Sequence, residues 1–199
     1  MDKKTITLPV IPEKLNYIDE YSNIFDGGEF LRNGKVITID DIKVFDGGSI
    51  KSLIGKILED IKNRDSVTIL DYGSGHGLHW HEKKINSKSL TEHIGLKLQS
   101  FYKYDPAVVE YKKKPIGVFD MVICTDVLEH VPIDDVPSVL DDLNKYCHTN
   151  GNIYLSIATH PSHNSFKDGT NMHITIMPSS KWEELIKRYI NKKIVVEFN

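Results

Sequence analysis

A short glycine-rich segment is the part of this sequence best suited to bind a ligand. The apolar run from Val67 to Leu70 leads directly into Asp71, and glycines follow at 73, 75 and 77. Such a run predicts a central strand of a parallel sheet. The glycines then lie at the carboxyl edge of that sheet, where open α/β sheets bind ligands. Glycine suits this place because a side chain would keep a ligand away from the main chain.

The spacing of these glycines favours one class of cofactor over another. Dinucleotide-binding turns follow the pattern G-x-G-x-x-G, but here Gly77 comes one residue early and Leu78 holds the dinucleotide position. Asp71 stands just before the turn, where its charge would repel a pyrophosphate and attract a cationic ligand. A ligand with an ammonium and a sulfonium group therefore fits better than one with two phosphates. A nicotinamide-dependent oxidoreductase is the alternative that this spacing disfavours.

Three segments, in this order, resemble the class I S-adenosylmethionine-dependent methyltransferases. They are the glycine turn with its strand (69–77), Tyr-Asp-Pro at 104–106, and the block from Phe119 to Val131 that contains Leu-Glu-His. The resemblance covers roughly Ser49 to Phe198. Residues 45–49 and 171–175 also look like parts of a bacterial and phage subgroup that acts on small molecules. The resemblance implies a methyltransferase with S-adenosylmethionine as cofactor and S-adenosylhomocysteine as product.

The resemblance also implies which residues hold the cofactor. Asp71 and the turn would face its methionine part, and Asp105 would accept hydrogen bonds from both ribose hydroxyls, for which a carboxylate is well suited. The two residues after Asp105 would line the adenine, and those that follow Cys124 would lie under the methyl-donor region. The full set is Asp71, Tyr72, Gly73, Ser74, Gly75, Gly77, Asp105, Pro106, Ala107, Thr125, Asp126 and Val127.

The segment after Cys124 also bears on the methyl acceptor. Amino-methylating DNA enzymes of the family carry an Asn/Asp-Pro-Pro-aromatic run there, and cytosine C5 enzymes carry a Pro-Cys nucleophile. This chain has Cys-Thr-Asp-Val at 124–127 instead. We therefore expect O- or N-methylation of a small molecule or a sugar-containing metabolite. A nucleic-acid methyltransferase of the same fold and a non-catalytic, cofactor-binding partner subunit are the alternatives.

Three histidines are candidates for moving a proton from the acceptor. His130 lies near the expected methyl site, and His160 and His173 belong to an irregular stretch that borders the acceptor pocket in this fold. A histidine can act as a general base near neutral pH. The alternative for His130 is a structural hydrogen bond. We expect no metal, because the cluster of histidines at 76, 79 and 81 has no matching pattern such as His-Glu-x-x-His.

Charge and composition narrow the choice of partner and compartment. The 199 residues hold 25 Lys+Arg and 28 Asp+Glu, a net charge of −3. Only Arg32, Arg64 and Arg188 are arginines, which disfavours nucleic-acid binding. Cys124 and Cys147 lie in apolar surroundings without a CxxC pair and indicate buried thiols. With no signal peptide and no membrane-spanning run, the chain is expected in the cytoplasm and not in a membrane.

The elements that must position these residues alternate between strand and helix. The pattern predicts a three-layer, Rossmann-like α/β fold with a mostly parallel sheet. Residues 1–48 are expected to form an arm or lid with a strand near 35–39, and residues 49–199 the cofactor-binding domain. Ser49 is the expected N-cap of the first helix of that domain. Expected helices span 50–61, 133–146 and 178–190, and expected strands 67–70, 102–106, 118–124, 152–158 and 193–198.

Two strands of the methyltransferase fold are hard to find in this chain. Little room exists for the third family strand between Asp105 and Phe119. The chain also ends about where the sixth strand should end. The last strand is therefore expected to be missing or replaced, with 36–39 and 174–177 as candidate replacements.

Overall fold

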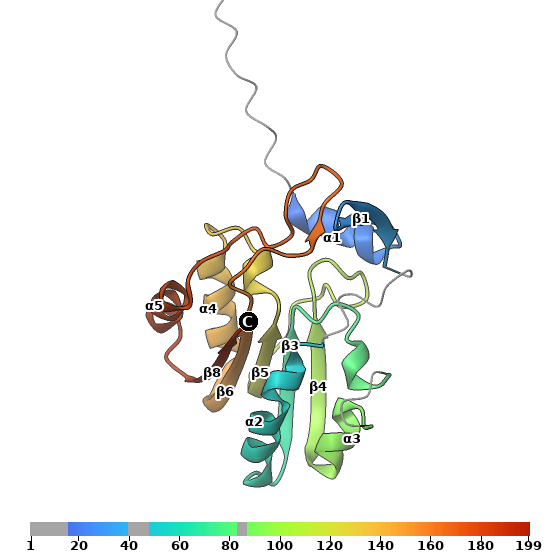
Figure 1. The fold of residues 1–199 in the computed structure, drawn as a ribbon. Coiled ribbons are helices and arrows are strands. Elements are labelled where there is room, and N and C mark those ends of the chain that lie inside the picture. Colours follow the sequence, from blue (N-terminus) through green and yellow to red (C-terminus); the bar gives the residue numbers. More distant parts are fainter. Residues whose placement is uncertain (1–15, 40–47, 83–86) are drawn as a thin grey trace, which may run out of the picture.

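The computed structural model describes residues 16–39, 48–82 and 87–199, which form two sheets with flanking helices (Figure 1). The helices are α1 (Tyr17–Phe25), α2 (Ile50–Lys62), α3 (Leu90–Ile94), α4 (Val136–Tyr146) and α5 (Ser179–Tyr189), with 3-10 turns at Leu78–Trp80, Gly95–Lys97 and Leu128–His130. The strands are β1 (Glu29–Arg32), β2 (Lys35–Thr38), β3 (Val67–Tyr72), β4 (Leu98–Tyr104), β5 (Phe119–Thr125), β6 (Cys147–Ile157), β7 (Asn164–Ser165) and β8 (Lys193–Phe198).

The larger sheet has five parallel strands in the order β4-β3-β5-β6-β8. Alternate side chains along each strand point to opposite faces. Leu70 on β3 packs with α4 and α5, whereas Ile69 packs with α2 and α3. Because both faces are covered, the strands read as continuous apolar runs. The three-layer α/β fold predicted from the sequence is confirmed.

The described residues give the main sheet no counterpart of the two family strands that are hard to find in the sequence. β8 pairs directly with β6, from Asn152↔Lys193 to Ile157↔Phe198. Neither candidate replacement joins this sheet: Lys35–Thr38 pairs with β1 in the smaller sheet, and residues 174–177 are not a strand. Within the described part of the chain, no strand lies between Asp105 and Phe119 either. Residues 16–39, 48–82 and 87–199 therefore supply neither the last family strand nor a replacement for it.

The smaller sheet joins the N-terminal segment to a segment far along the chain. Its order is β2-β1-β7, with all strands antiparallel. Ile24 and Phe30 pack with Phe166 and Met172 in a separate buried cluster. In Figure 1, α1 and β1 consequently lie beyond the carboxyl ends of the main strands. The predicted strand near 35–39 is present as β2. Of residues 45–49, which carry part of the family resemblance, 45–47 lie outside the described residues.

Some local expectations were wrong. The Ser49 side chain does not cap α2, because its hydroxyl donates to the carboxylate of Asp126. α4 begins at Val136, later than expected, with a proline in its first turn, which suits a residue without an N–H group. The strand expected at 152–158 begins earlier, because β6 already starts at Cys147 and includes Asn150 and Gly151, where the register against β5 shifts.

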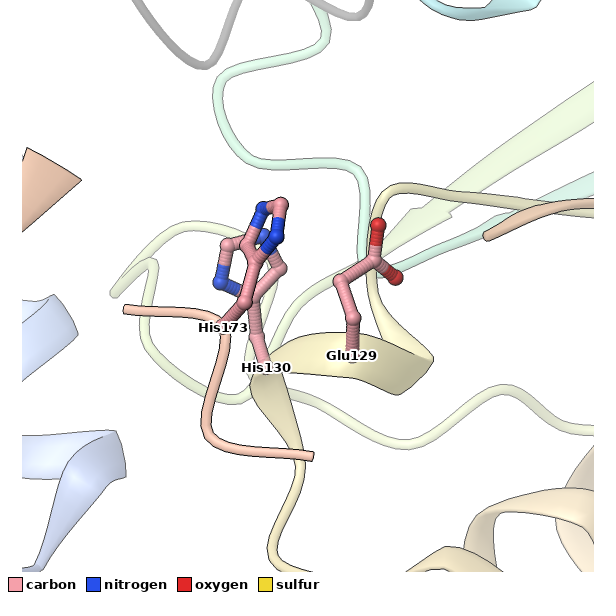
Figure 2. A group of neighbouring side chains, drawn as sticks. All are labelled: Glu129, His130 and His173. Atoms are coloured by element: carbon pink, nitrogen blue, oxygen red, sulfur yellow. The ribbon is translucent and has the colours of Figure 1, made fainter. Parts of the chain in front are cut away.

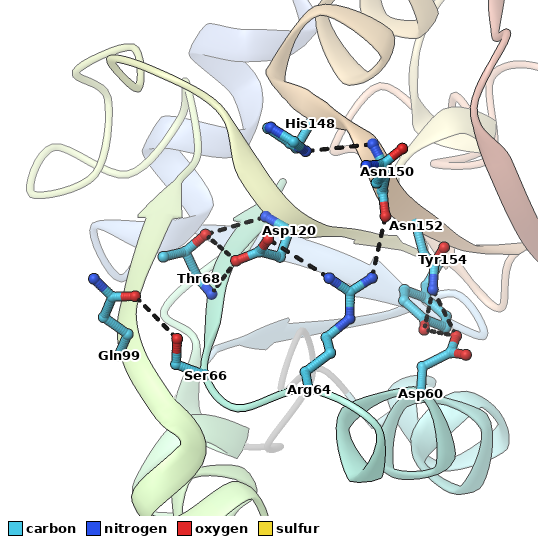
Figure 3. Close-up of polar contacts among 10 residues, drawn as sticks. All are labelled: Asp60, Arg64, Ser66, Thr68, Gln99, Asp120, His148, Asn150, Asn152 and Tyr154. Atoms are coloured by element: carbon cyan, nitrogen blue, oxygen red, sulfur yellow. Dashed lines mark hydrogen bonds and ion pairs between the residues drawn. The ribbon is translucent and has the colours of Figure 1, made fainter.

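Polar contacts tie the amino ends of the main strands together (Figure 3). Asp120 on β5 accepts hydrogen bonds from the N–H and hydroxyl of Thr68 at 2.9 and 2.8 Å, and its carboxylate lies 3.6 Å from the Arg64 guanidinium. Nearby, Asp60 accepts hydrogen bonds from Asn152 and Tyr154. Asp60, Arg64 and Asp120 at this end of the sheet therefore each have a polar partner.

Two further sequence expectations concern thiols and membranes. Cys124 and Cys147 are free and buried, as predicted. In the described ranges, no helix has both the length and the apolar character needed to cross a bilayer.

Candidate active site

A cavity of about 570 Å³ opens at the carboxyl end of the main sheet. Residues from the glycine turn, from the ends of β4, β5 and β6, and from α1 line it. Thirteen of the fifteen site residues expected from the sequence lie in this lining: Asp71, Gly73, Ser74, Gly75, Asp105, Pro106, Ala107, Thr125, Asp126, Val127, His130, His160 and His173. The fold thus brings together residues that are far apart in the sequence.

Tyr72 and Gly77 are the two expected residues that do not line the cavity. Tyr72 belongs to the apolar cluster under α4, and its hydroxyl donates to Asp142 at 3.2 Å. Strand alternation explains this, because Asp71 and Tyr72 must point to opposite faces. Gly77 instead packs against Lys103, whose Cδ lies 2.5 Å from where a Cβ would stand.

The glycine turn is shaped by backbone conformations that other residues rarely adopt. Gly73 has a φ of +74°, and a Cβ there would lie 2.3 Å from a methyl group of Val127. The N–H groups of Gly73 and Ser74 both donate to the carbonyl of Tyr104. Glycine at 73 therefore lets the turn pack between the ends of β4 and β5.

Asp105 follows β4 and is held by the turn beside it. Its carboxylate accepts hydrogen bonds from the N–H groups of Gly75 at 2.8 Å and Ala107 at 2.9 Å. Burial raises the pKa of this carboxyl above its ordinary value, and the two N–H donors act in the opposite direction. Each oxygen keeps a further lone pair. A fixed, buried carboxylate of this kind suits a pair of ribose hydroxyls.

Asp71 is also buried, at 2% exposure, and faces the same cavity. One carboxylate oxygen accepts a hydrogen bond from the Trp80 indole at 2.7 Å, and His79 Nε2 lies 3.2 Å from that oxygen. Neither ring nitrogen of His79 makes a hydrogen bond to any described residue. In the described part of the chain, Nε2 of His79 thus has only the Asp71 contact and Nδ1 has none, and a buried ring of this kind in a cavity wall is suited to a polar ligand.

The three candidate histidines gather on the other side of the cavity. The His173 ring lies edge-on to His130, with centroids 4.9 Å apart, and 5.8 Å from His160. Tyr21 of α1 contacts Nδ1 of His130 through its hydroxyl at 2.6 Å. This side is therefore assembled from α1, from the turn at Leu128–His130 and from the segment after β6.

Burial and neighbouring charges shift the pKa values of this group. Burial, with a contribution from His173, lowers the pKa of His130 to about 3. The pKa of His173 is also lowered, mainly by burial. Burial and the charge of Asp126 raise the pKa of Glu129 to about 8. Both of these imidazoles are consequently neutral near pH 7. The surroundings of Glu129 disfavour the charged form of its carboxyl group.

A protein-family model described as a methyltransferase domain matches residues 47–189. The chain belongs to this methyltransferase family. Like the cavity, the match includes the turn after β3, the end of β4 and the segment after β5. This methyltransferase uses S-adenosylmethionine as its methyl donor, which also decides against a nicotinamide-dependent oxidoreductase.

Solved structures with some likeness to this methyltransferase were also found. An O-methyltransferase family protein from Burkholderia thailandensis has a TM-score of 0.43 and 12% identity, over 71% of this chain and 52% of that one. PKMT2 from Rickettsia typhi, in complex with AdoHcy, has a TM-score of 0.26 and 20% identity, over 44% of this chain and 20% of that one. The chain thus spans about half and a fifth of their lengths. No curated protein matched.

The methyltransferase cavity also includes residues that the sequence did not reveal. Tyr21 and Arg32 come from the N-terminal segment, and Ser162 and Asn164 from the segment after β6. No motif marks these positions, because pairing of β1 with β7 brings them to the cavity. In the sequence, His79 stands out only because it is close to His76 and His81. Its place in the cavity wall follows from the structure, where the side chain is buried.

Proposed function

We propose that this methyltransferase modifies a small molecule or a sugar-containing metabolite in the cytoplasm, at an oxygen or nitrogen atom. The observation that supports this most is that α1 forms part of the cavity wall. Tyr17, Ile18, Tyr21 and Phe25 of α1 line the same cavity as the glycine turn. A cavity of about 570 Å³ is in the range of small-molecule sites.

In this proposal, the half of the cavity near β3 and β4 holds the cofactor. Asp71 and the turn bind its methionine part, and Asp105 binds the ribose. Pro106 and Ala107 line the adenine, and Thr125 to Val127 lie beneath the methyl donor. The support is that all of these residues line one cavity and that both carboxylates are held in place by hydrogen bonds.

The other half of the cavity holds the acceptor. The bound cofactor supplies a methyl group already activated on sulfur, so the chain's main task is alignment. As the acceptor bonds to the methyl carbon, the carbon–sulfur bond breaks and its electron pair stays on sulfur. A proton on the acceptor must pass to a base. His130, His160 and His173 are the proposed candidates because all three line this half.

Arg32 suggests the chemical nature of the acceptor. Its side chain is exposed, and within the described lining of the cavity it is the only arginine or lysine. A guanidinium binds carboxylate or phosphate groups through paired hydrogen bonds. We infer an acceptor with one anionic group, which differs from a polyanion that would need many cations.

Transfer of a labelled methyl group tests the proposal. The protein is incubated with tritiated S-adenosylmethionine and separate pools of metabolites, RNA, DNA and protein. We expect label in the metabolite pool. The control variant Glu110→Ala, at an exposed residue outside the cavity lining, should transfer as much label as the wild type. Label that enters RNA or DNA instead would make the chain a nucleic-acid methyltransferase. Binding of S-adenosylhomocysteine without any transfer would favour the non-catalytic partner subunit.

A further inference from the structure

Three side chains with metal-binding atoms meet on the acceptor side of the cavity (Figure 2). One nitrogen from each of His130 and His173 and one oxygen of Glu129 all lie within 4.8 Å of one another. Glu129 and His130 come from the 3-10 turn after β5, and His173 from the segment that returns from β7. Among the described residues, no other group of three such ligands occurs.

Both imidazole rings are held in the orientation that metal-binding histidines need. Nδ1 of His130 lies 2.9 Å from the carbonyl oxygen of Met172, and Nδ1 of His173 lies 2.5 Å from that of His160. A carbonyl oxygen only accepts, so the tautomer with hydrogen on Nδ1 satisfies both of these contacts. At His130 the Tyr21 hydroxyl, 2.6 Å from Nδ1, then donates to the same Met172 carbonyl at 3.4 Å. Nε2 of each ring then carries a lone pair. Carbonyl groups fix the tautomer of metal-ligating histidines in the same way.

Glu129 is the third ligand and has an oxygen that lacks a partner. The residue is completely buried. One carboxylate oxygen accepts a hydrogen bond from the N–H of Ala158 at 2.8 Å, whereas the other has no hydrogen-bond partner among the described residues. A buried carboxylate oxygen without a partner is costly. The carboxylate of Asp126 lies near enough to add to the negative potential at Glu129.

We propose that Glu129, His130 and His173 bind a divalent transition-metal cation beside the acceptor. Two imidazoles and a carboxylate suit such cations, and three protein ligands leave coordination positions open. Ligand bonds of about 2.0–2.2 Å require the three side chains to draw closer together than in the present arrangement. The unpaired oxygen of Glu129 would then gain a partner.

The cation site adds the chemical class of the acceptor to the proposed function. This part of the inference rests on the proposed function, whereas cation binding itself does not. An open coordination position next to the methyl donor favours an acceptor hydroxyl, whose pKa a bound cation lowers. The oxygen then forms its bond to the methyl carbon, the carbon–sulfur pair stays on sulfur, and the hydroxyl proton passes to a base. Because His130 and His173 are ligands here, His160 is left as the base at the edge of the cavity.

Ligand spacing in the sequence does not reveal this site. The histidines at 76, 79 and 81 attract attention because they are close in sequence, yet no metal-binding group among the described residues includes them. His173 reaches the Glu-His pair only because β7 pairs with β1 and the following residues return along the cavity. The expectation that no metal is bound considered local patterns alone.

Cation binding can be measured without knowing the acceptor. The full chain is treated with a chelator and dialysed, and Mn²⁺ is titrated while the electron paramagnetic resonance signal of free Mn²⁺ is followed. We expect one bound Mn²⁺ per chain, displaced by Zn²⁺. The melting temperature should rise by about 5–10 °C at a cation concentration of about 100 times Kd.

Matched variants locate the site. Glu129→Gln and His173→Gln should weaken Mn²⁺ binding about 100-fold, since each removes one of three ligands. His163→Gln is the control, because His163 is an exposed histidine outside the cavity lining. A thermal shift with S-adenosylhomocysteine shows that each variant is folded. Should His173→Gln fail to fold, Glu129→Gln decides, since its amide oxygen still accepts from Ala158.

The outcomes separate the two proposals. If neither Mn²⁺ nor Zn²⁺ binds at millimolar concentration, the cation site is wrong, while S-adenosylhomocysteine binding in the same sample leaves the methyltransferase assignment standing. Equal Mn²⁺ affinity in Glu129→Gln and wild type also overturns the site. Conversely, cation binding that is lost in Glu129→Gln supports the site even where no metabolite takes up label, an outcome that would contradict only the proposed acceptor class.

Discussion

The two ends of the main sheet differ in how many of their buried polar groups have hydrogen-bond partners. At the amino end, Asp120 accepts from two groups of Thr68 and lies beside Arg64, and Asp60 accepts from Asn152 and Tyr154 (Figure 3). At the carboxyl end, Asp71 and Asp105 are hydrogen-bonded, but several other buried atoms in the described part of the chain lack partners. Five buried side-chain atoms have no hydrogen-bond partner among the described residues, and four of them belong to His79, Glu129 and Asn164.

We interpret the paired groups at the amino end as stabilising the fold and the unpaired groups at the carboxyl end as available to bind a ligand. His79 and Asn164 line the cavity, and Glu129 lies beside it. Natural proteins satisfy nearly all of their buried polar groups, so a local concentration of exceptions calls for an explanation. The amino end should therefore respond to mutation through stability and the carboxyl end through binding.

The largest expected effect is on cofactor binding at Asp105. Asp105→Ala removes the proposed ribose acceptor, and we expect affinity for S-adenosylhomocysteine to fall about 100-fold, since hydrogen bonds to a charged group contribute about 1.5–3 kcal/mol each. Calorimetric titration measures this. Asp105→Asn keeps one oxygen acceptor for the turn and should bind with intermediate affinity, and Glu110→Ala should match wild type. Unchanged affinity in Asp105→Ala would remove Asp105 from the cofactor site.

Asp120→Ala breaks the network at the opposite end and should act on stability alone. Thr68 loses the acceptor for its N–H, and Arg64 loses its ion pair. We expect the free energy of unfolding to fall by about 1–2 kcal/mol, because Asp120 is partly exposed. The melting temperature should drop by about 2–8 °C. Affinity for S-adenosylhomocysteine should stay within about twofold of wild type; a larger loss would erase the contrast between the two ends.

A smaller effect is expected at Arg32, on the acceptor side. Arg32→Gln should raise the KM for the labelled metabolite about 10-fold with little change in kcat, because the contact would hold the acceptor equally before and during transfer. Initial rates at increasing amounts of the metabolite pool measure this. The control is Arg188→Gln on the exposed side of α5. A fall in kcat at unchanged KM would contradict the anchoring role.

Tyr72→Phe should have the smallest effect and tests a residue that the sequence placed in the cofactor site. The hydroxyl donates to Asp142 on the α4 side, so its loss should cost about 0.5–1.5 kcal/mol of stability. Chemical denaturation measures that loss. Cofactor affinity should not change. A tenfold loss of affinity would show that Tyr72 does contribute to cofactor binding.

That the proposed cofactor residues line one cavity could be predicted, because each group of them is local in sequence. The glycine turn and Asp105 each directly follow a strand, and parallel strands bring their carboxyl ends to one edge. Tyr72 is one exception among the predicted cofactor residues and does not line the cavity, since a motif names consecutive residues whereas a strand points them to alternate sides. The helices and strands from 49 onward also followed from apolar periodicity, with errors at their ends.

The acceptor half was less predictable because three distant segments build it. Nothing in the spacing of Arg32, Asn164 and His173 places them together, and only the pairing of β1 with β7 does so. Ser49 shows the same limit at a single residue. Its type and position favour a helix cap, but its hydroxyl contacts Asp126 across the fold. Tertiary contacts of this kind override local preference.

The indole of Trp80 gives the protein a built-in optical reporter. Trp80 donates to Asp71 at 2.7 Å, stacks on Phe101 at 4.7 Å and is fully buried. The chain has only one other tryptophan, Trp182, which packs on the opposite face of the main sheet. A positive charge that settles against Asp71 would alter the field across the Trp80 ring. Its emission should therefore shift when the cofactor's methionine part binds, over a constant background from Trp182.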